Sequence, residues 1–239
     1  TDEIDEAPVR DAELSAMYPQ IRSYLGQGLE DPTASIRMSL DPSGVRIQVL
    51  SASGSMYLDP YSRDDATLYA AYTRADLGPR PAGLVCGVTP DAEDLARWAG
   101  KPQITARNGT SRREFRIALA STVEHTDFHS VPADTVAQKK TKVTAAFNAL
   151  LTKVNGIYER DMAVRLKLVA GSQNVIFTAE PDGYTSGGGR LVLWGENQTI
   201  LDQAPPAGVG NANYDIGHLL DKAAGTSFAK LVSTIERDL

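Results

Sequence analysis

The sequence predicts an α+β protein in two parts. A β-rich unit is expected over residues 1–107, and an α/β unit with one long helix on a twisted mixed sheet over residues 112–239. Three observations predict this division. The net charge of −6 lies entirely within the first 110 residues. Apolar residues alternate with polar ones in the first part and recur at helical spacing in the second. A segment rich in proline and glycine lies between the two.

The composition is that of an ordinary globular protein, with 42% hydrophobic and 23% charged residues among 239. The negative net charge argues against nucleic-acid binding, because phosphates attract a basic surface. No apolar run reaches the roughly 18 residues that span a bilayer. The single cysteine, Cys86, excludes an intrachain disulfide framework and a four-cysteine zinc module. Because the sequence begins at Thr1, we expect a removed signal peptide or a piece of a longer chain.

Strict alternation of polar and apolar residues predicts the strands of the first unit. Turn residues separate the alternating segments, with Asp-Pro-Ser-Gly at 41–44 and Ser-Ala-Ser-Gly at 51–54. This pattern predicts an antiparallel meander with one buried face. The expected strands are residues 35–40, 45–50, 55–59 and 67–72.

Residues 78–83 read Gly-Pro-Arg-Pro-Ala-Gly, which cannot hold a helix and favours an extended chain. This stretch leads into Leu-Val-Cys-Gly-Val-Thr-Pro-Asp at 84–91. A short helix is expected over residues 91–99, and a polar linker over residues 101–111.

A long amphipathic helix is expected over residues 133–160, with Asp134 or Thr135 as its N-cap. Its apolar residues are spaced by three, four and seven positions, which marks one buried stripe. A strand is expected before it at residues 113–120, so this helix is the crossover of an α/β layer. The stripe comprises Val136, Val143, Phe147, Leu150, Leu151, Val154 and Tyr158, and later strands are expected at residues 164–169, 174–179 and 191–194.

His125 and His129 are four residues apart, the spacing of two metal ligands on one helical turn. Their surroundings favour a polar loop between a strand and the helix, and Thr126 stands where the zinc-protease helix has glutamate. A metal site and a polar loop are both considered, and the polar loop is favoured. His218 follows Gly217 at the end of a strand, where a structural role is expected.

Cys86 lies in a segment that should be extended, because proline and glycine precede it and Gly87 follows. A thiolate is a strong ligand for zinc. Lying in a protease cleft, the segment could place this sulfur at the open position of a catalytic zinc. A free cysteine is also commonly a small buried hydrophobe. From its position alone, the two interpretations are equal.

Residues 84–91 resemble the cysteine-switch segment of metzincin protease propeptides, particularly those of the reprolysin/adamalysin type. Residues 59–63 resemble a propeptide segment of the bacterial reprolysin-like metallopeptidases. The resemblance continues over most of the chain, from about residue 14 to residue 220. Residues 114–120 resemble the first strand of the catalytic domain, residues 154–161 the end of its first helix, and residues 213–218 the strand that borders its substrate cleft.

The resemblance implies a secreted or extracellular zinc endopeptidase precursor, with a propeptide followed by the upper half of a metzincin-like domain. It implies that Cys86, flanked by Gly87 and Val88, binds the catalytic zinc of the complete zymogen. It also implies an edge strand that pairs with a peptide or protein substrate and, in this chain alone, favours self-association. That edge strand comprises Tyr214, Asp215, Ile216, Gly217 and His218.

The sequence departs from the family at the catalytic motif. Family members carry H-E-x-x-H-x-x-G-x-x-H after the cleft strand, and these 239 residues contain no such motif. We therefore expect this chain alone to be inactive and to hold no zinc of its own. Two hypotheses follow: a segment of a protease zymogen, which is favoured, or a naturally truncated homologue that acts as an inhibitor or protein-binding module.

Overall fold

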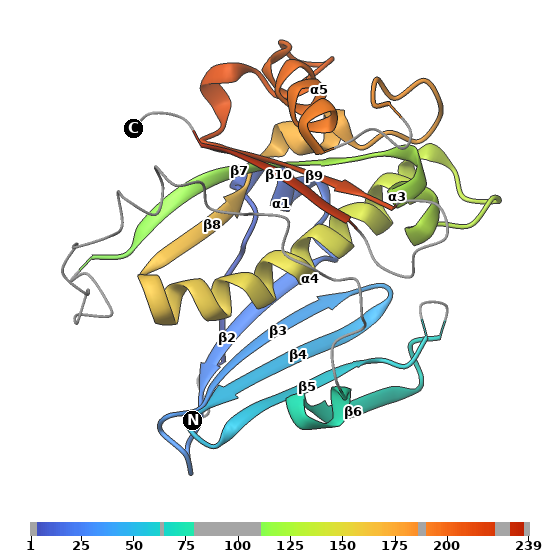
Figure 1. Ribbon diagram of the computed structural model, residues 1–239. Coiled ribbons are helices and arrows are strands. Elements are labelled where there is room, and N and C mark those ends of the chain that lie inside the picture. Colours follow the sequence, from blue (N-terminus) through green and yellow to red (C-terminus); the bar gives the residue numbers. More distant parts are fainter. Residues whose placement is uncertain (1–3, 63–64, 79–110, 186–189, 223–229, 237–239) are drawn as a thin grey trace.

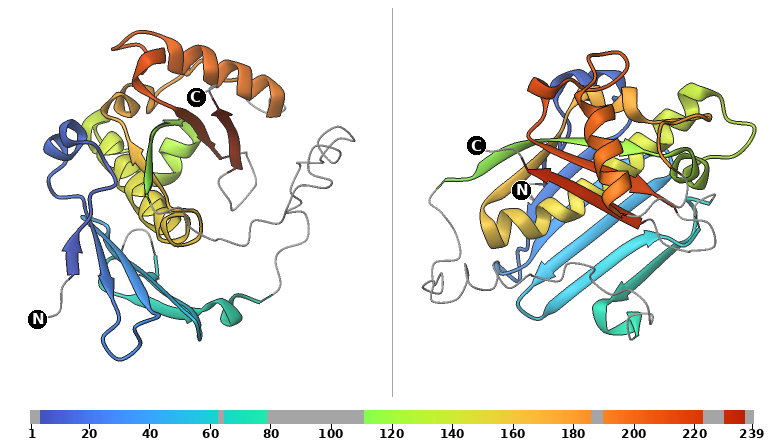
Figure 2. Two further views of the ribbon diagram at one scale, coloured as in Figure 1. Left: turned by 90° about the vertical axis from the view of Figure 1, so that its left-hand side faces the viewer. Right: turned by 45° about the horizontal axis from the view of Figure 1, so that its top comes forward.

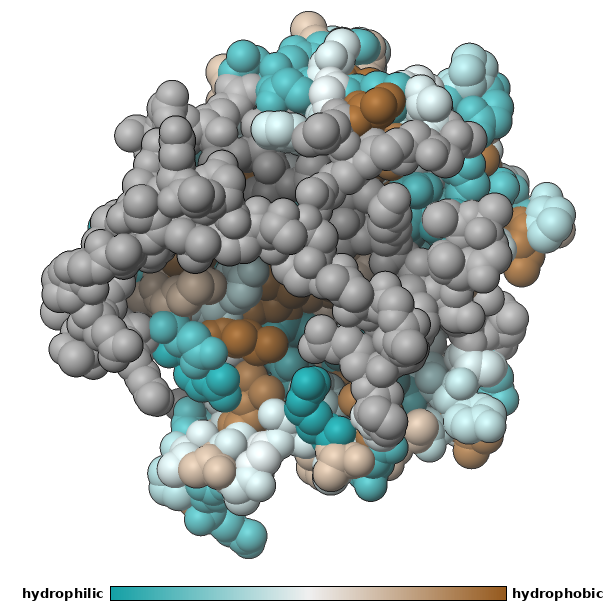
Figure 3. All heavy atoms as spheres, in the orientation of Figure 1, coloured by the Kyte–Doolittle hydropathy of each residue, from teal (hydrophilic) through white to brown (hydrophobic). Residues whose placement is uncertain are grey.

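The computed structural model describes residues 4–62, 65–78, 111–185, 190–222 and 230–236. Its elements form four layers, in the order α5, a second sheet, α4 and a first sheet (Figure 1). The mixed α+β architecture predicted from the sequence is confirmed. None of the described helices is both long enough and apolar enough to cross a membrane. Polar side chains cover most of the visible described surface, and hydrophobic ones reach it in small groups (Figure 3).

The first sheet is an antiparallel meander of six strands in chain order. The predicted hairpins are confirmed, and Gly44 and Gly54 adopt φ values of +118° and +137°, which favour glycine. A short strand, a helix and a second strand precede the predicted ones. The elements are β1 (Ile4–Glu6), α1 (Ala12–Met17), β2 (Arg22–Gln27), β3 (Ser35–Asp41), β4 (Gly44–Ser51), β5 (Gly54–Pro60), β6 (Tyr69–Thr73) and η1 (Arg74–Leu77).

The polar face of the first sheet is the one that packs on α4. Arg37 donates a hydrogen bond from Nη2 to Glu159 Oε2 of α4, at 2.9 Å. Gln48 Oε1 lies so close to α4 that a Cβ atom on Gly156 would come within 2.7 Å of it. Side chains alternate along a strand, so Met38 of β3 and Ile47 and Val49 of β4 face away from α4 and stay partly exposed, whereas Leu50 lies on the same face as Gln48 and is buried.

The second sheet has the order β10-β9-β7-β8. Strand β7 pairs in parallel with β8 and with β9, and β10 pairs antiparallel with β9. Helix α4 covers one face and α5 the other (Figures 1 and 2). The elements are β7 (Arg113–Ser121), α3 (Val123–His129), α4 (Val136–Met162), β8 (Val164–Leu168), η2 (Ala170–Val175), α5 (Arg190–Asp202), η3 (Asn211–Asn213), β9 (Ile216–Asp221) and β10 (Lys230–Glu236).

Helix α4 is the predicted long helix, and it is confirmed. Thr135 is its N-cap and forms a capping box with Gln138. The helix ends where Ala163 takes a left-handed conformation, with φ of 55°. Phe147 and Leu151 of its apolar stripe are buried against β7 and β8, as the spacing predicted, whereas Val136 and Tyr158, expected in the same stripe, are 59% and 37% exposed.

Three predicted elements differ from the structure. Residues 191–194 lie in α5 and do not form a strand, and most of residues 174–179 lie in η2 or in a loop. His125 and His129 lie on α3, a short helix capped by Thr122, and not in a loop. A short apolar run fits a buried helix and a strand equally well, so periodicity alone could not separate them.

The N-terminal segment of the predicted first unit belongs to the core of the second. Val9 and Leu14 are buried in the same cluster as Phe147 and Leu168. The division at residues 107–112 therefore does not separate the hydrophobic cores cleanly. Residues 107–110 of the predicted boundary and the predicted cysteine-switch segment, residues 84–91, lie outside the described residues.

Phe147→Ala should lower the free energy of unfolding by about 3–5 kcal/mol, because it leaves a cavity in the core. Phe147 is 0% exposed. The matched control on the same helix is Val136→Ala, because Val136 is 59% exposed; we expect its effect to stay within about 0.5 kcal/mol. Urea denaturation measures both. Similar losses in the two variants would contradict the assigned core.

Candidate functional site

The strand predicted to form the edge of a substrate cleft is not an edge strand. β9 (Ile216–Asp221) is hydrogen-bonded to β7 on one side and to β10 on the other. Its residues Ile216, Gly217 and His218 therefore have sheet partners on both sides. The prediction was wrong because it did not include a strand after β9. Among the described strands, β10 is at this edge of the sheet.

Tyr214 and Asp215, the other two residues of the predicted cleft strand, precede β9 and hold the second unit together. Tyr214 is 1% exposed, and its hydroxyl donates to Asp202 Oδ1 at 2.9 Å. Asp215 accepts hydrogen bonds from the guanidinium and the backbone N–H of Arg116 on β7. These contacts fix the start of β9 and the position of α5. Both side chains are therefore engaged in hydrogen bonds within the protein.

His218 lies in the middle of β9, next to Leu119 of β7 and Thr234 of β10. It is 8% exposed. Ile216 and Leu220 pack in the core on the α4 side, so alternation places His218 on that same face. The structure does not bring it together with His125 and His129 in a three-ligand group. This position agrees with the structural role expected for His218.

His125 and His129 lie one turn apart on α3, with ring centres 4.7 Å apart. His125 is 2% exposed, and its Nδ1 lies 2.8 Å from Ser121 Oγ. Burial, and then the neighbouring His129, lower the pKa of His125 to about 3. The imidazole is therefore neutral at ordinary pH. Its hydrogen bond to Ser121 and its stacking on Phe147 assign it to the core.

The chain's own residues do not fit a zinc site of the H-E-x-x-H type. In the described part of the chain, the group of three potential ligands that come together consists of Glu124, Glu180 and Asp182. Its ligand atoms lie within 4.8 Å of one another and are all carboxylate oxygens. Carboxylates alone suit calcium or magnesium better than zinc.

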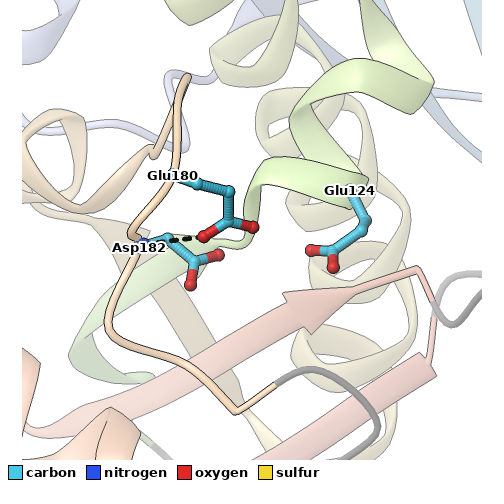
Figure 4. Close-up of side chains that lie close together, drawn as sticks. All are labelled: Glu124, Glu180 and Asp182. Atoms are coloured by element: carbon cyan, nitrogen blue, oxygen red, sulfur yellow. Dashed lines mark hydrogen bonds between the residues drawn. The ribbon is translucent and has the colours of Figure 1, made fainter.

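This carboxylate trio was not singled out from the sequence. Glu180 and Asp182 lie on the loop before α5, and Glu124 faces them from α3 (Figure 4). The close spacing of Glu180 and Asp182 was visible in the sequence. Their approach to Glu124 depends on how the loop packs against α3.

Two members of the trio, Asp182 and Glu180, have structural roles that need no bound ion. Asp182 is 3% exposed and accepts a hydrogen bond from the backbone N–H of Val123 at 3.0 Å. This bond gives a partner to one of the N–H groups that have none within the helix at the start of α3. The other carboxylate oxygen of Asp182 accepts the N–H of Tyr184 at 2.9 Å. Glu180 accepts the N–H of Asp182 at 3.1 Å. These bonds tie the loop before α5 to the end of β7, where α3 begins.

A cavity of about 1100 Å³ lies between the first sheet and helices α3 and α4. One wall comes from the β3–β4 turn, with Asp41 and Arg46, and the other comes from α3, α4 and Lys222. Lys222 lies over the ring of Phe128, with its Nζ 4.2 Å from the ring centre. The cavity is lined by charges of both signs, and it adjoins the end of β9.

The free energy of unfolding should fall as the pH is lowered from about 6.5 toward about 3, because of His125. In that range the unfolded chain binds a proton on this imidazole and the folded chain does not. The loss can reach about 1.4 kcal/mol per pH unit.

His125→Asn should therefore lose less stability than the wild type between pH 6.5 and 4. Ser121→Ala is the control, because it leaves the imidazole buried and should keep the wild-type slope. Urea denaturation at several pH values measures the slopes. An unchanged slope in His125→Asn would contradict the burial of a neutral imidazole.

Residues 144–234 match the family model described as Metallo-peptidase family M12B Reprolysin-like. The match begins inside α4 and ends in β10, so it includes β8, α5 and β9. No curated protein and no solved structure matches the chain. Over residues 144–234, from within α4 to β10, the protein is therefore similar to the reprolysin-like metallopeptidases.

Proposed function

We propose that this chain is part of a secreted zinc metalloendopeptidase precursor, in which the first unit is an inhibitory propeptide. The match of residues 144–234 to a reprolysin-like metallopeptidase family carries this proposal. The second sheet, with α4 and α5 on its two faces, is the corresponding part of the fold. Peptides or proteins are the substrates that such a family implies.

The separate first sheet supports a propeptide role. Hydrogen bonds and ion pairs join this sheet to α4. Lys153 of α4 donates to Asp59 of β5 at 2.7 Å, and Ser23 of β2 donates to Asn148 of α4 at 3.0 Å. Polar contacts can be replaced by water, so this surface suits a unit that is later removed.

Cys86 is proposed as the inhibitory ligand, together with the flanking Gly87 and Val88. These residues lie outside the described part of the chain, and their role rests on the resemblance of residues 84–91 to a cysteine switch. The chain's own residues do not fit the catalytic zinc. In this proposal, residues that the present sequence does not contain hold the metal, and the chain alone is inactive.

Cys86→Ala tests the switch in a version of the protein extended through H-E-x-x-H. We expect peptide hydrolysis without prior activation, because the thiolate no longer occupies the metal. Ser130→Ala serves as the control and should stay latent. Unchanged latency in Cys86→Ala, with a wild-type thiol inert to alkylation, would contradict the proposal.

The alternative is a non-catalytic homologue that acts as an inhibitor or protein-binding module. The absence of H-E-x-x-H from these residues favours it. The coding sequence after Leu239 separates the two functions. A downstream H-E-x-x-H supports the protease precursor, and a stop codon supports the binding module.

A further inference from the structure

Residues 7–21, which we name the anchor segment, connect the first sheet to the second unit. The backbone N–H of Asp11 donates to Leu168 O at 2.9 Å, and the N–H of Leu168 donates to Val9 O at 2.8 Å. Arg10 forms a parallel bridge with Leu168 of β8. The anchor segment therefore pairs with β8 at the edge of the second sheet opposite to β10.

The side chains of the anchor segment enter the core of the second unit. Val9 is 4% exposed and Leu14 is 1% exposed. Both belong to the cluster formed by α4, β7 and β8. These contacts exclude water, in contrast to the polar contacts between the first sheet and α4.

Arg10 connects the anchor segment to α4. Arg10 is 4% exposed, and its guanidinium donates to Asn148 Oδ1 at 3.2 Å. It also donates to three backbone carbonyls of the anchor segment. Those carbonyls belong to Leu14 and Tyr18, at 3.1 and 3.3 Å, and to Ile21.

Asp11 fixes the same segment to the chain after β8. Its Oδ1 accepts the N–H of Leu14 at 2.8 Å, which caps α1. Its Oδ2 accepts the N–H of Ala170 at 2.6 Å. Pro8 O accepts a further bond from Arg165 Nη2 of β8, at 2.8 Å.

We propose that the anchor segment holds the first unit on the second as a non-covalent partner after the chain is cut between them. Hydrolysis of one peptide bond between residues 79 and 110 consumes a water and creates a new carboxylate and a new amine. It breaks none of the contacts of the anchor segment. Release of the first unit then needs a second cut, or unfolding of the anchor segment.

The regulatory consequence rests on the proposed function. In a protease precursor, a single cut after residue 91 would leave the inhibitory unit, which includes Cys86, bound, so that activation would be a two-step process. The binding itself is independent of zinc and of activity. It depends on the core packing and on the hydrogen bonds of Arg10 and Asp11.

The test uses the full chain with a flexible recognition sequence for a sequence-specific protease inserted between residues 79 and 110. The protein is cleaved to completion, as judged on a denaturing gel, and passed over a size-exclusion column in native buffer. We expect the two fragments to co-elute and to separate only in denaturant. Fragments that separate while folded would overturn the proposal.

Arg10→Ala in the same cleavable chain tests the contacts themselves. We expect the Kd between the fragments to rise by about tenfold or more, because hydrogen bonds from a buried charge are lost. Arg22→Ala is the matched control, since Arg22 is an exposed arginine on β2; its effect should be less than about twofold. Equal effects of the two substitutions would overturn the role of Arg10.

If the uncut Arg10→Ala chain lacks a folded near-UV circular dichroism spectrum, Arg10→Lys takes its place. Lysine keeps the charge but not the planar fork of donors, so the affinity should still fall. Wild-type affinity in Arg10→Lys would overturn the role of the guanidinium. Because co-elution needs no activity, its failure is distinct from failure of the Cys86 experiment.

Discussion

Helix α4 lies between the two sheets, and each sheet depends on a different face of that helix. One face carries Phe147 and Leu151 into the apolar core beneath β7 and β8. The opposite face presents Asn148 and Lys153 to the polar side of the first sheet. A single amphipathic helix thus supplies an apolar contact to one sheet and a hydrogen-bonded contact to the other.

Periodicity was sufficient to predict α4, the β3–β4–β5 hairpins and the order of strand, helix and strand in the second unit. It could not show which face of the first sheet is covered. Alternation placed Arg37 and Met38 on opposite faces correctly, but the polar face packs on α4, because that helix offers Glu159 to Arg37. The helix at residues 190–202 was missed because a short apolar run fits both a strand and a helix.

The candidate site was less predictable than the fold, because it depends on contacts between distant segments. The sequence predicted a strand at residues 214–218, which overlaps β9, but it did not predict the pairing of β9 with β10, so an edge strand was expected. Glu124 approaches Asp182 because the loop before α5 folds over the start of α3. No local sequence pattern indicates such packing between distant segments. Conversely, His125, one of the two histidines that the spacing singled out, is accounted for by the core, through Ser121 and Phe147.

Residues 7–21 belong to the first part of the sequence, but their apolar side chains pack in the hydrophobic core of the second unit. This packing joins the two units more firmly than surface contacts would. Native-state hydrogen exchange followed by NMR tests it most directly. The amide of Asp11, bonded to Leu168, should exchange as slowly as the amide of Leu168 itself, and more slowly than that of Tyr57 in the first sheet. Exchange of Asp11 at the rate of the first sheet would contradict this account.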